Sequence, residues 1–132
     1  LTLLLERDGE ILLEVPLSPE DWQKKELKRE VSQLLREVET CVKFHEAFTN
    51  ENRVRMLKSL LEDDDYTIKF KDFRESLGLN PKLIRENALK LRDLGLLEYP
   101  RRGEYRLSKR GRICFMMTGV AMRRMLMTME EE

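Results

Sequence analysis

The segment that decides the fold is residues 77–112, "LGLNPKLIRENALKLRDLGLLEYPRRGEYRLSKRGR". Asn80 followed by Pro81 predicts the start of a helix, because asparagine caps free backbone N–H groups and proline fits the first helical position. The helix is predicted over residues 81–94 and ends at Gly95, a residue type that is common just past helix ends. The segment therefore begins with a well-defined helix.

A small β-hairpin is predicted directly after this helix, over residues 97–107. Two short strand-like runs, "LLEY" and "EYRL", flank the turn from Pro100 to Gly103. Arg101 and Arg102 lie at the tip of this turn, where a side chain contributes little to a core. Two guanidinium groups in such a place favour contact with phosphate or with a narrow minor groove. The alternative is that both arginines only keep the loop soluble.

A second, shorter helix is predicted just before Asn80, in the run "FKDFRESLG". Phe73 and Leu77 form its buried face, and Gly78 is expected to end it in a left-handed conformation. The connection "LGLN" between the two helices has the length that a helix-turn-helix needs. We therefore predict a helix-turn-helix followed by a hairpin.

The longer helix is expected to have one buried stripe and one outward face. Ile84, Ala88, Leu91 and Gly95 follow the spacing of a buried stripe. The other positions turn outwards, namely Lys82, Arg85, Glu86 and Leu89, with Asn87 and Lys90 on the flanks. Arginine, lysine, asparagine and glutamate can each bond a base edge in the major groove of DNA. The alternative is a solvated ion-pair ladder formed by Lys82, Glu86 and Lys90.

The quoted segment resembles the second half of a winged helix-turn-helix domain in bacterial and archaeal transcription regulators, of the ArsR and HxlR types. In those families a short helix, "LG(L/I)S", a recognition helix, "GL(V/L)", a wing and "YxLTxxGR" recur in this order. The earlier run "TNENRVRMLKSLLEDD" fits the first half of the pattern, and the resemblance covers about residues 46–115. It implies a mainly α fold with a small β-wing.

The resemblance also implies a homodimeric transcriptional repressor that binds double-stranded DNA in a sequence-specific manner. The helix over residues 81–94 would enter the major groove, and the wing over residues 97–107 would lie on the backbone or in the minor groove. The residues predicted to contact DNA are Lys82, Arg85, Glu86, Asn87 and Lys90 on the helix, with Arg101, Arg102 and Arg106 in the wing.

Two departures from the family pattern limit what can be carried over. Pro81 and Leu83 stand where many relatives have polar residues, so the base-reading code does not transfer. The cysteine-rich metal-sensing motif is missing from "KFKDFRESLG", and we expect no metal or other cofactor.

Cys41 and His45 have the spacing of half a zinc or copper site. However, no second pair of ligands is visible in the sequence, so packing is the favoured interpretation.

The two ends of the chain lie outside the resemblance. The predicted division is an N-terminal β-hairpin extension (1–20), a long heptad-patterned helix (21–48), the winged helix-turn-helix (49–112) and a methionine-rich C-terminal helix (113–132). A seam on the long helix consists of Leu27, Val31, Leu34, Val38, Cys41, His45 and Phe48. Both end helices are predicted to form a dimer, the alternative being that the seam packs on its own domain. For the hairpin, a strand shared across the dimer, a ligand-sensing addition and a partner-docking strip all stay open.

Positive charge is confined to one part of a chain that is neutral as a whole, with 25 basic and 25 acidic residues. Residues 1–65 carry 10 basic and 16 acidic side chains, a balance of −6, whereas residues 66–112 carry 13 and 6, a balance of +7. Such asymmetry is typical of a surface that faces an anion. The overall neutrality keeps open an alternative, a winged-helix module for protein–protein contact in a transcription or replication assembly.

The remaining features indicate the cellular compartment and exclude some classes of function. Two cysteines do not make a disulfide framework, which favours the cytoplasm, and no apolar run has the length of a membrane span. The abundance of glutamate and lysine, with only two glutamines, favours a heat-adapted source, and the resemblance is taken to imply an archaeal one. With one histidine and no nucleophile–base pattern, the chain is not expected to be an enzyme. A small-molecule effector is not identified by the sequence.

Overall fold

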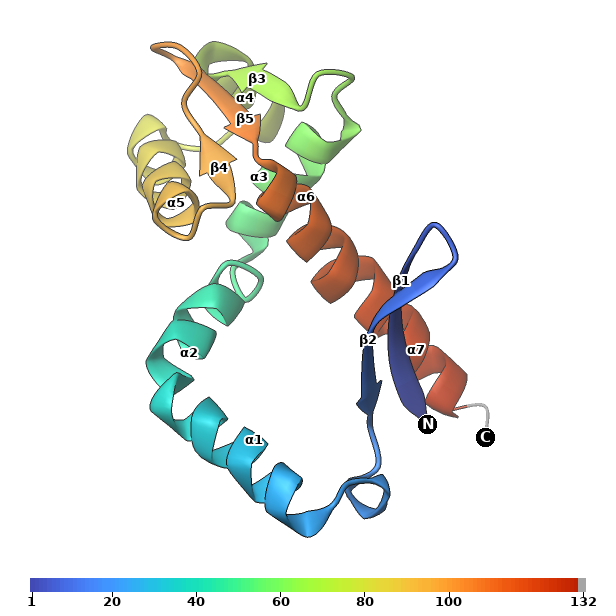
Figure 1. Ribbon diagram of the computed structural model, residues 1–132. Helices are drawn as coiled ribbons and strands as arrows, with labels where there is room; N and C mark the ends of the chain where they lie inside the picture. Colours follow the sequence, from blue (N-terminus) through green and yellow to red (C-terminus); the bar gives the residue numbers. More distant parts are fainter. Residues whose placement is uncertain (131–132) are drawn as a thin grey trace. The chain divides into compact units, whose positions relative to one another are not determined.

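The computed structural model describes residues 1–130, and the chain divides into two compact units, residues 1–41 and residues 42–132. The second unit contains the helix-turn-helix and the wing, and it holds the hydrophobic core (Figure 1). The first unit consists of a β-hairpin and most of the N-terminal helical segment. Each unit is described here by itself.

Three helices of the second unit form the predicted helix-turn-helix and its support. They are α3 (Glu51–Glu62), α4 (Phe70–Leu77) and α5 (Pro81–Asp93). Asn50 caps α3 by accepting from the backbone N–H groups of Asn52 and Arg53, and Asn80 caps α5 by accepting from Lys82 at 2.8 Å. Gly78 ends α4 with a φ of 62°, as its position predicted.

A three-stranded antiparallel sheet completes this unit. It contains β3 (Thr67–Lys69), β4 (Leu97–Glu98) and β5 (Glu104–Leu107) in the order β3-β5-β4. Strands β4 and β5 form the predicted wing, residues 97–107, with Leu97 opposite Leu107. Its turn uses Gly103 at a φ of 76°, a conformation that costs glycine little.

The core lies between the three helices and the inner side of the sheet. Apolar side chains from α3, α4, α5 and the strands are removed from solvent, which is the main stabilising term for a domain of this size. The fully buried large residues are Met56, Leu57, Leu60, Phe73, Ile84, Leu91, Leu96, Leu97 and Leu107. The predicted stripe on α5 is therefore confirmed for Ile84, Ala88 and Leu91, whereas Gly95, beyond the end of α5, is exposed.

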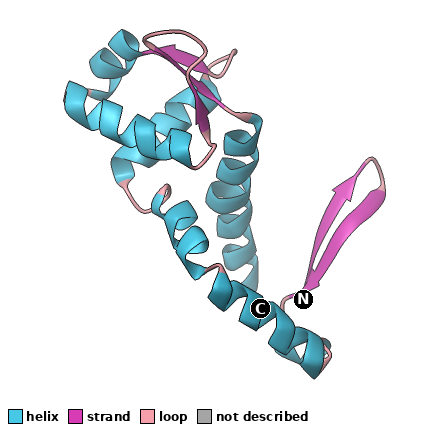
Figure 2. Cartoon of the chain, turned by 60° about the vertical axis from the view of Figure 1, so that its left-hand side comes forward, coloured by secondary structure: helices cyan, strands magenta, loops and turns pink. Residues whose placement is uncertain are grey.

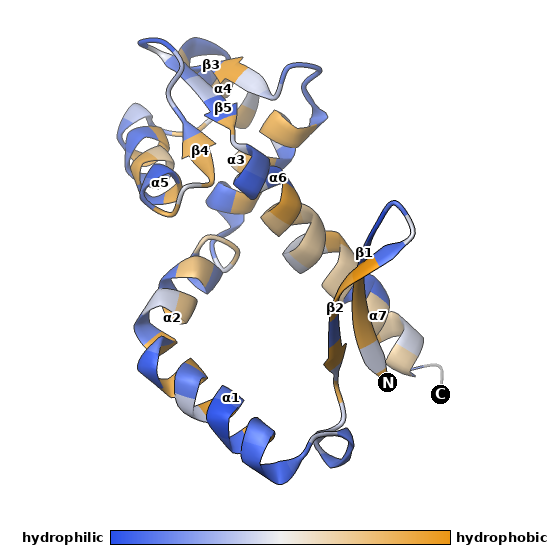
Figure 3. Cartoon of the chain, viewed as in Figure 1, coloured by the Kyte–Doolittle hydropathy of each residue, from blue (hydrophilic) through white to orange (hydrophobic). Residues whose placement is uncertain are grey.

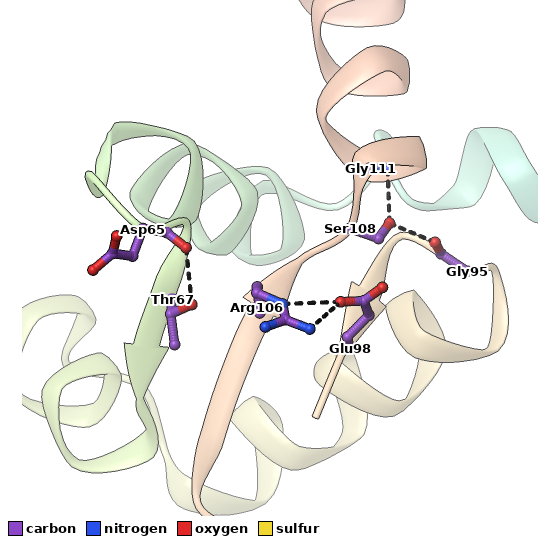
Figure 4. A network of polar contacts seen from close by, with 7 residues as sticks. All are labelled: Asp65, Thr67, Gly95, Glu98, Arg106, Ser108 and Gly111. Carbon is purple, nitrogen blue, oxygen red and sulfur yellow. Dashed lines mark hydrogen bonds and ion pairs between the residues drawn. The ribbon is translucent and has the colours of Figure 1, made fainter. Parts of the chain in front are cut away.

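The C-terminal helical segment begins earlier than predicted. It runs through α6 (Lys109–Phe115), a π-helical stretch η2 (Met116–Ala121) and α7 (Met122–Glu130), whereas the sequence placed its start at residue 113. Ser108 is the reason, because its Oγ accepts from the Gly111 N–H at 2.9 Å and donates to the Gly95 carbonyl at 2.6 Å (Figure 4). This cap fixes the helix start four residues before the predicted boundary.

The first unit contains the hairpin that the Asp-Gly turn predicted. Strands β1 (Thr2–Arg7) and β2 (Glu10–Pro16) pair without a third strand (Figure 2). Asp8 and Gly9 have φ values of 51° and 83°, and two successive positive values are those of the type I′ turn that Asp-Gly favours.

The prediction of one continuous helix over residues 21–48 is wrong. The Ser18-Pro19 start signal produces only a short 3-10 turn, η1 (Pro19–Asp21), and the helical segment then forms α1 (Lys24–Arg36) and α2 (Val38–Glu46). Glu37 separates the two helices with φ −104° and ψ 11°, outside helical values. The division between the two units falls inside α2, after Cys41.

The first unit has no buried residue in the structure, and most of its large apolar side chains are exposed. Figure 3 marks the hydrophobic residues along β1 and β2 of this unit. Leu3, Leu5 and Leu13, on facing positions of the hairpin, are each at least half exposed. The seam residues Val31 and Leu34 of α1 are also about half exposed. A two-stranded hairpin and a single helix without a core are only marginally stable in water. The exposed apolar side chains of this unit therefore lack the packing partners that a stable structure needs.

Candidate nucleic-acid interface

The recognition helix α5 and the wing enclose a shared hollow on the surface of the second unit. The hollow has a volume of about 450 Å³. It is lined by Phe70, Arg85, Leu89, Tyr99, Arg102, Gly103 and Tyr105. Arg85 comes from α5 and Arg102 from the tip of the wing, so one guanidinium group from each element borders the same space.

Aromatic rings form the floor of this hollow. Tyr105 is 7% exposed, and its ring centroid lies 5.1 Å from that of Tyr99, 5.8 Å from that of Phe73 and 6.5 Å from that of Phe70. Burial raises the pKa of Tyr105 and of Tyr99 above the ordinary value of 10.0. Both phenols are therefore neutral at physiological pH, and the floor adds no negative charge that would repel phosphate.

The guanidinium carbons of two arginines of α5 lie over these aromatic rings. The Cζ atom of Arg85 lies 4.7 Å from the ring centroid of Phe70, and that of Arg92 lies 4.7 Å from the ring centroid of Tyr99. Arg92 was not among the predicted DNA-binding residues. The available signal was its position seven residues after Arg85, which places both side chains on one side of the helix.

The other predicted residues of α5 are distributed around its exposed surface. Lys82 and Glu86 form an exposed ion pair at 3.8 Å. This is the first pair of the ion-pair ladder that was predicted for Lys82, Glu86 and Lys90. Lys90 lies about 140° around the helix from Arg85, and it borders a different pocket together with Arg53. The structure therefore does not bring Lys90 to the hollow beside Arg85.

Asn87 is buried, and the prediction that it contacts a base is wrong for this structure. The residue is 6% exposed, and its Oδ1 accepts from the guanidinium of Arg53 at 3.2 Å. The same guanidinium donates to the backbone carbonyl of Glu46 at 2.7 and 3.1 Å. Asn87 follows Ile84 by three residues, which places it beside the buried stripe. Sequence reasoning missed Arg53, a charged residue that is 7% exposed on α3.

Arg106 is exposed but already paired. Its Nε and NH2 atoms donate to Oε2 of Glu98 at 2.9 and 2.8 Å (Figure 4). Glu98 of β4 lies directly opposite Arg106 of β5, so strand register creates this pair. The carboxylate offsets part of the positive charge of Arg106, and the predicted DNA contact of Arg106 stays a prediction.

Arg101 and Arg102 lie where they were predicted. Both are exposed in the turn between β4 and β5. No ion pair involves either residue among residues 1–130. Two adjacent charges without an acidic partner at a loop tip remain available to an anion.

Replacing Asn87 with alanine is expected to destabilise the protein by about 1–3 kcal/mol, because the buried guanidinium of Arg53 then loses an acceptor. Urea unfolding at fixed protein concentration measures the change. The matched control is Glu86→Ala on the neighbouring exposed position, which should change stability by less than about 0.5 kcal/mol. Equal stability of Asn87→Ala and the natural protein would contradict a structural role for this amide.

Neither a metal centre nor a membrane span is indicated in the described part of the chain. Residues 1–130 contain no group of three or more histidine, cysteine, aspartate or glutamate side chains that is placed to hold a metal ion. No helix within this range combines the length and the apolar character needed to cross a membrane.

Comparison with known proteins gives a similarity in fold. No protein-family model matches the chain, and no curated protein sequence shows significant similarity to it. Among solved structures, the crystal structure of the antimony-specific transcriptional repressor AntR is similar, with a TM-score of 0.51 and 17% sequence identity. The match covers 86% of this chain and 97% of the AntR chain. At this identity the similarity shows that the fold is shared.

Proposed function

We propose that this protein is a sequence-specific DNA-binding transcriptional regulator that acts as a homodimer and as a repressor. The observation that carries the proposal is the placement of Arg85 from α5 and Arg102 from the wing around one hollow. A duplex that receives α5 in its major groove meets the wing on its backbone or in its minor groove. The two elements therefore present their cations to a single ligand.

The proposed contacts fall into two groups with different chemistry. Lys82, Arg85 and Glu86 are exposed on α5 and carry groups that bond base edges in the major groove. Arg101 and Arg102 are proposed to bind phosphates, which position the protein without reading sequence. Asn87 is left out because its side chain is buried and bonded to Arg53. Arg106, exposed in the wing beside Glu98, is proposed as a further phosphate contact.

The fold and the charge distribution support the same proposal. The fold is shared with a protein described as a transcriptional repressor. The helix-turn-helix and the wing lie in the segment of residues 66–112, which carries 13 basic and 6 acidic side chains. A local excess of positive charge provides the sequence-independent part of DNA affinity. Such a regulator would act in the cytoplasm.

A titration of the full chain with random duplex DNA at several salt concentrations tests the proposal. A regulator should bind at about 50 mM salt and lose affinity steeply by about 200 mM. The competing function, a winged-helix module for protein–protein contact, is favoured by the exposed apolar surface of residues 1–41. It predicts negligible DNA affinity at every salt concentration, and that result would exclude the regulator.

The homodimer is supported by the location of exposed apolar side chains. Large exposed hydrophobic residues concentrate in two segments, residues 1–42 and 113–129, whereas the helix-turn-helix and wing expose only Leu83, Leu89 and Tyr99. Large apolar side chains exposed in such number within one segment are typical of an interface. A second copy of the chain supplies matching surfaces from the same two segments, which is the arrangement of a two-fold symmetric dimer.

Replacing Leu34 on the seam with glutamate is expected to convert the dimer into a monomer at micromolar concentration. The carboxylate would lose its hydration in an apolar interface, which costs several kcal/mol. Light scattering after size-exclusion chromatography measures the molar mass. Ser32→Glu adds the same charge on the exposed part of α1 outside the seam and should leave the mass unchanged. A dimeric Leu34→Glu variant would exclude this seam as the interface.

A further inference from the structure

Arg85 and Arg92 have matching environments on the same side of α5. Each guanidinium carbon lies 4.7 Å from the centroid of an aromatic ring, that of Phe70 for Arg85 and that of Tyr99 for Arg92. Phe70 is the first residue of α4, and Tyr99 follows β4 directly. The two contacts therefore connect the recognition helix to the helix before it and to the wing after it.

The two rings are themselves held by the core. Phe70 and Tyr99 both make ring contacts with Tyr105, at centroid distances of 6.5 and 5.1 Å, and Tyr105 is buried. Tyr99 is nevertheless 39% exposed. Packing alone gives little reason for a large ring at such an exposed position. Its exposed part is available to support a charged side chain from α5.

A contact with a ring face restricts the rotamers of an arginine and leaves its hydrogen-bond donors unoccupied. The N–H groups of a guanidinium lie in its plane, so a ring beneath that plane leaves them free for phosphate or base oxygens. A free arginine loses much rotamer freedom when it binds, whereas a stacked arginine has lost part of that freedom already. The contacts with Phe70 and Tyr99 thus reduce the cost of ordering Arg85 and Arg92 on DNA.

Arg92 has no carboxylate partner within ion-pair distance among residues 1–130. Its guanidinium lies beside the wing, two turns of helix after Arg85, whose guanidinium borders the hollow. Tyr99, the ring beneath the Arg92 guanidinium, also lines the hollow, so both arginines lie beside the same hollow. The group of DNA that carries charge on every nucleotide is the phosphate.

We propose that Tyr99 and Phe70 are positioning residues of the DNA interface, and that Arg92, held on Tyr99, contacts a backbone phosphate. The proposal rests on the proposed DNA-binding function and extends it to three residues that the sequence did not assign. It explains why an arginine and a half-exposed tyrosine face each other at the junction of helix and wing.

The test is fluorescence anisotropy of the full chain with a labelled random duplex of about 30 base pairs, between about 50 and 200 mM salt. For each bound protomer, Arg92→Ala should weaken binding about five-fold at 100 mM salt and reduce the salt slope by about one unit. Tyr99→Leu should weaken binding about three-fold, whereas Tyr99→Phe, which keeps the ring, should stay within about two-fold. Tyr99→Leu should have no further effect when Arg92 is already alanine.

A matched control and a second readout separate positioning from general damage. The Cζ atom of Arg112 lies 4.5 Å from the ring centroid of Tyr66, and neither residue borders the hollow. Tyr66→Leu should therefore leave DNA affinity within about two-fold of the natural protein. In the absence of DNA, the NMR signal of the Arg92 Nε–H group should show a ring-current shift that persists in Tyr99→Phe and disappears in Tyr99→Leu.

The outcomes distinguish this inference from the function on which it rests. Failure of the natural chain to bind any duplex at about 50 mM salt overturns the proposed function. Normal binding by the natural chain together with unchanged affinity of Arg92→Ala overturns only the phosphate contact of Arg92. A loss caused by Tyr99→Leu that is equally large in the Arg92→Ala background overturns the positioning role of Tyr99.

Discussion

Replacing Gly111 with alanine is expected to destabilise the second unit by about 3 kcal/mol or more. A Cβ atom at this position would collide with the carbonyl oxygen of Leu96 and lie 2.7 Å from Cδ1 of Leu107. The carbonyl has little freedom to move, because it accepts from the Ser108 N–H at 3.0 Å. The clash exceeds the gain of about 1 kcal/mol that alanine normally brings to a helix.

Gly119→Ala is the matched control for this prediction. Gly119 lies in the same helical segment, and a Cβ atom there would meet Phe115 Cε1 at 3.7 Å, an ordinary van der Waals contact. This variant should have unchanged stability or gain up to about 1 kcal/mol. Urea unfolding at fixed protein concentration compares the variants. A stability within about 0.5 kcal/mol of the natural value for Gly111→Ala would contradict the close packing of α6 on the loop after α5.

Replacing both Arg101 and Arg102 with alanine is expected to lower the affinity of each protomer for its half of the duplex about 30-fold at 100 mM salt, roughly 1 kcal/mol for each lost phosphate contact. The loss should be similar for every sequence, because phosphates carry no sequence information. The slope of log K against log salt should decrease by about two units for each bound protomer, and by about four for the homodimer, since each neutralised phosphate contributes about 0.9. Anisotropy titrations across a salt series measure both quantities.

Two other adjacent arginines provide a control with the same change in charge. Arg123 and Arg124 are exposed on α7, away from the wing in the sequence. Replacing both with alanine should change DNA affinity by less than about three-fold. An equal loss in the two double variants would assign the effect to net charge and not to the wing.

Arg85→Ala should instead relax the preference for particular base pairs, which a selection of bound genomic fragments can detect.

The elements of the second unit were largely predictable because their signals are local. Asn80 and Pro81 start α5, Gly78 ends α4, and Asn50 caps α3, each through bonds or backbone angles within a few residues. The Asp-Gly turn of the N-terminal hairpin acts in the same way. A local signal specifies a local structure wherever tertiary contacts do not oppose it.

The predicted division of the chain was less accurate where local signals compete. Ser18 and Pro19 indicated the start of a long helix, but they form only a short 3-10 turn before α1 begins at Lys24. A heptad pattern continues through Glu37 although the backbone leaves helical geometry there. Periodicity describes which side chains share a face, and it does not by itself require an unbroken helix.

The amino-acid sequence by itself determined the order of helices and strands, the position of the wing turn, and the exposure of Arg101 and Arg102 at its tip. Only the tertiary structure decided which polar side chains are bonded within the protein and which remain for the proposed DNA contact. Asn87 bonds to Arg53, a residue 34 positions away, and Arg106 bonds to Glu98 across the sheet, while Arg92 stacks on Tyr99. Caps and turns act over three or four residues of one chain segment, whereas the partner of a side chain depends on which distant segments the core brings together.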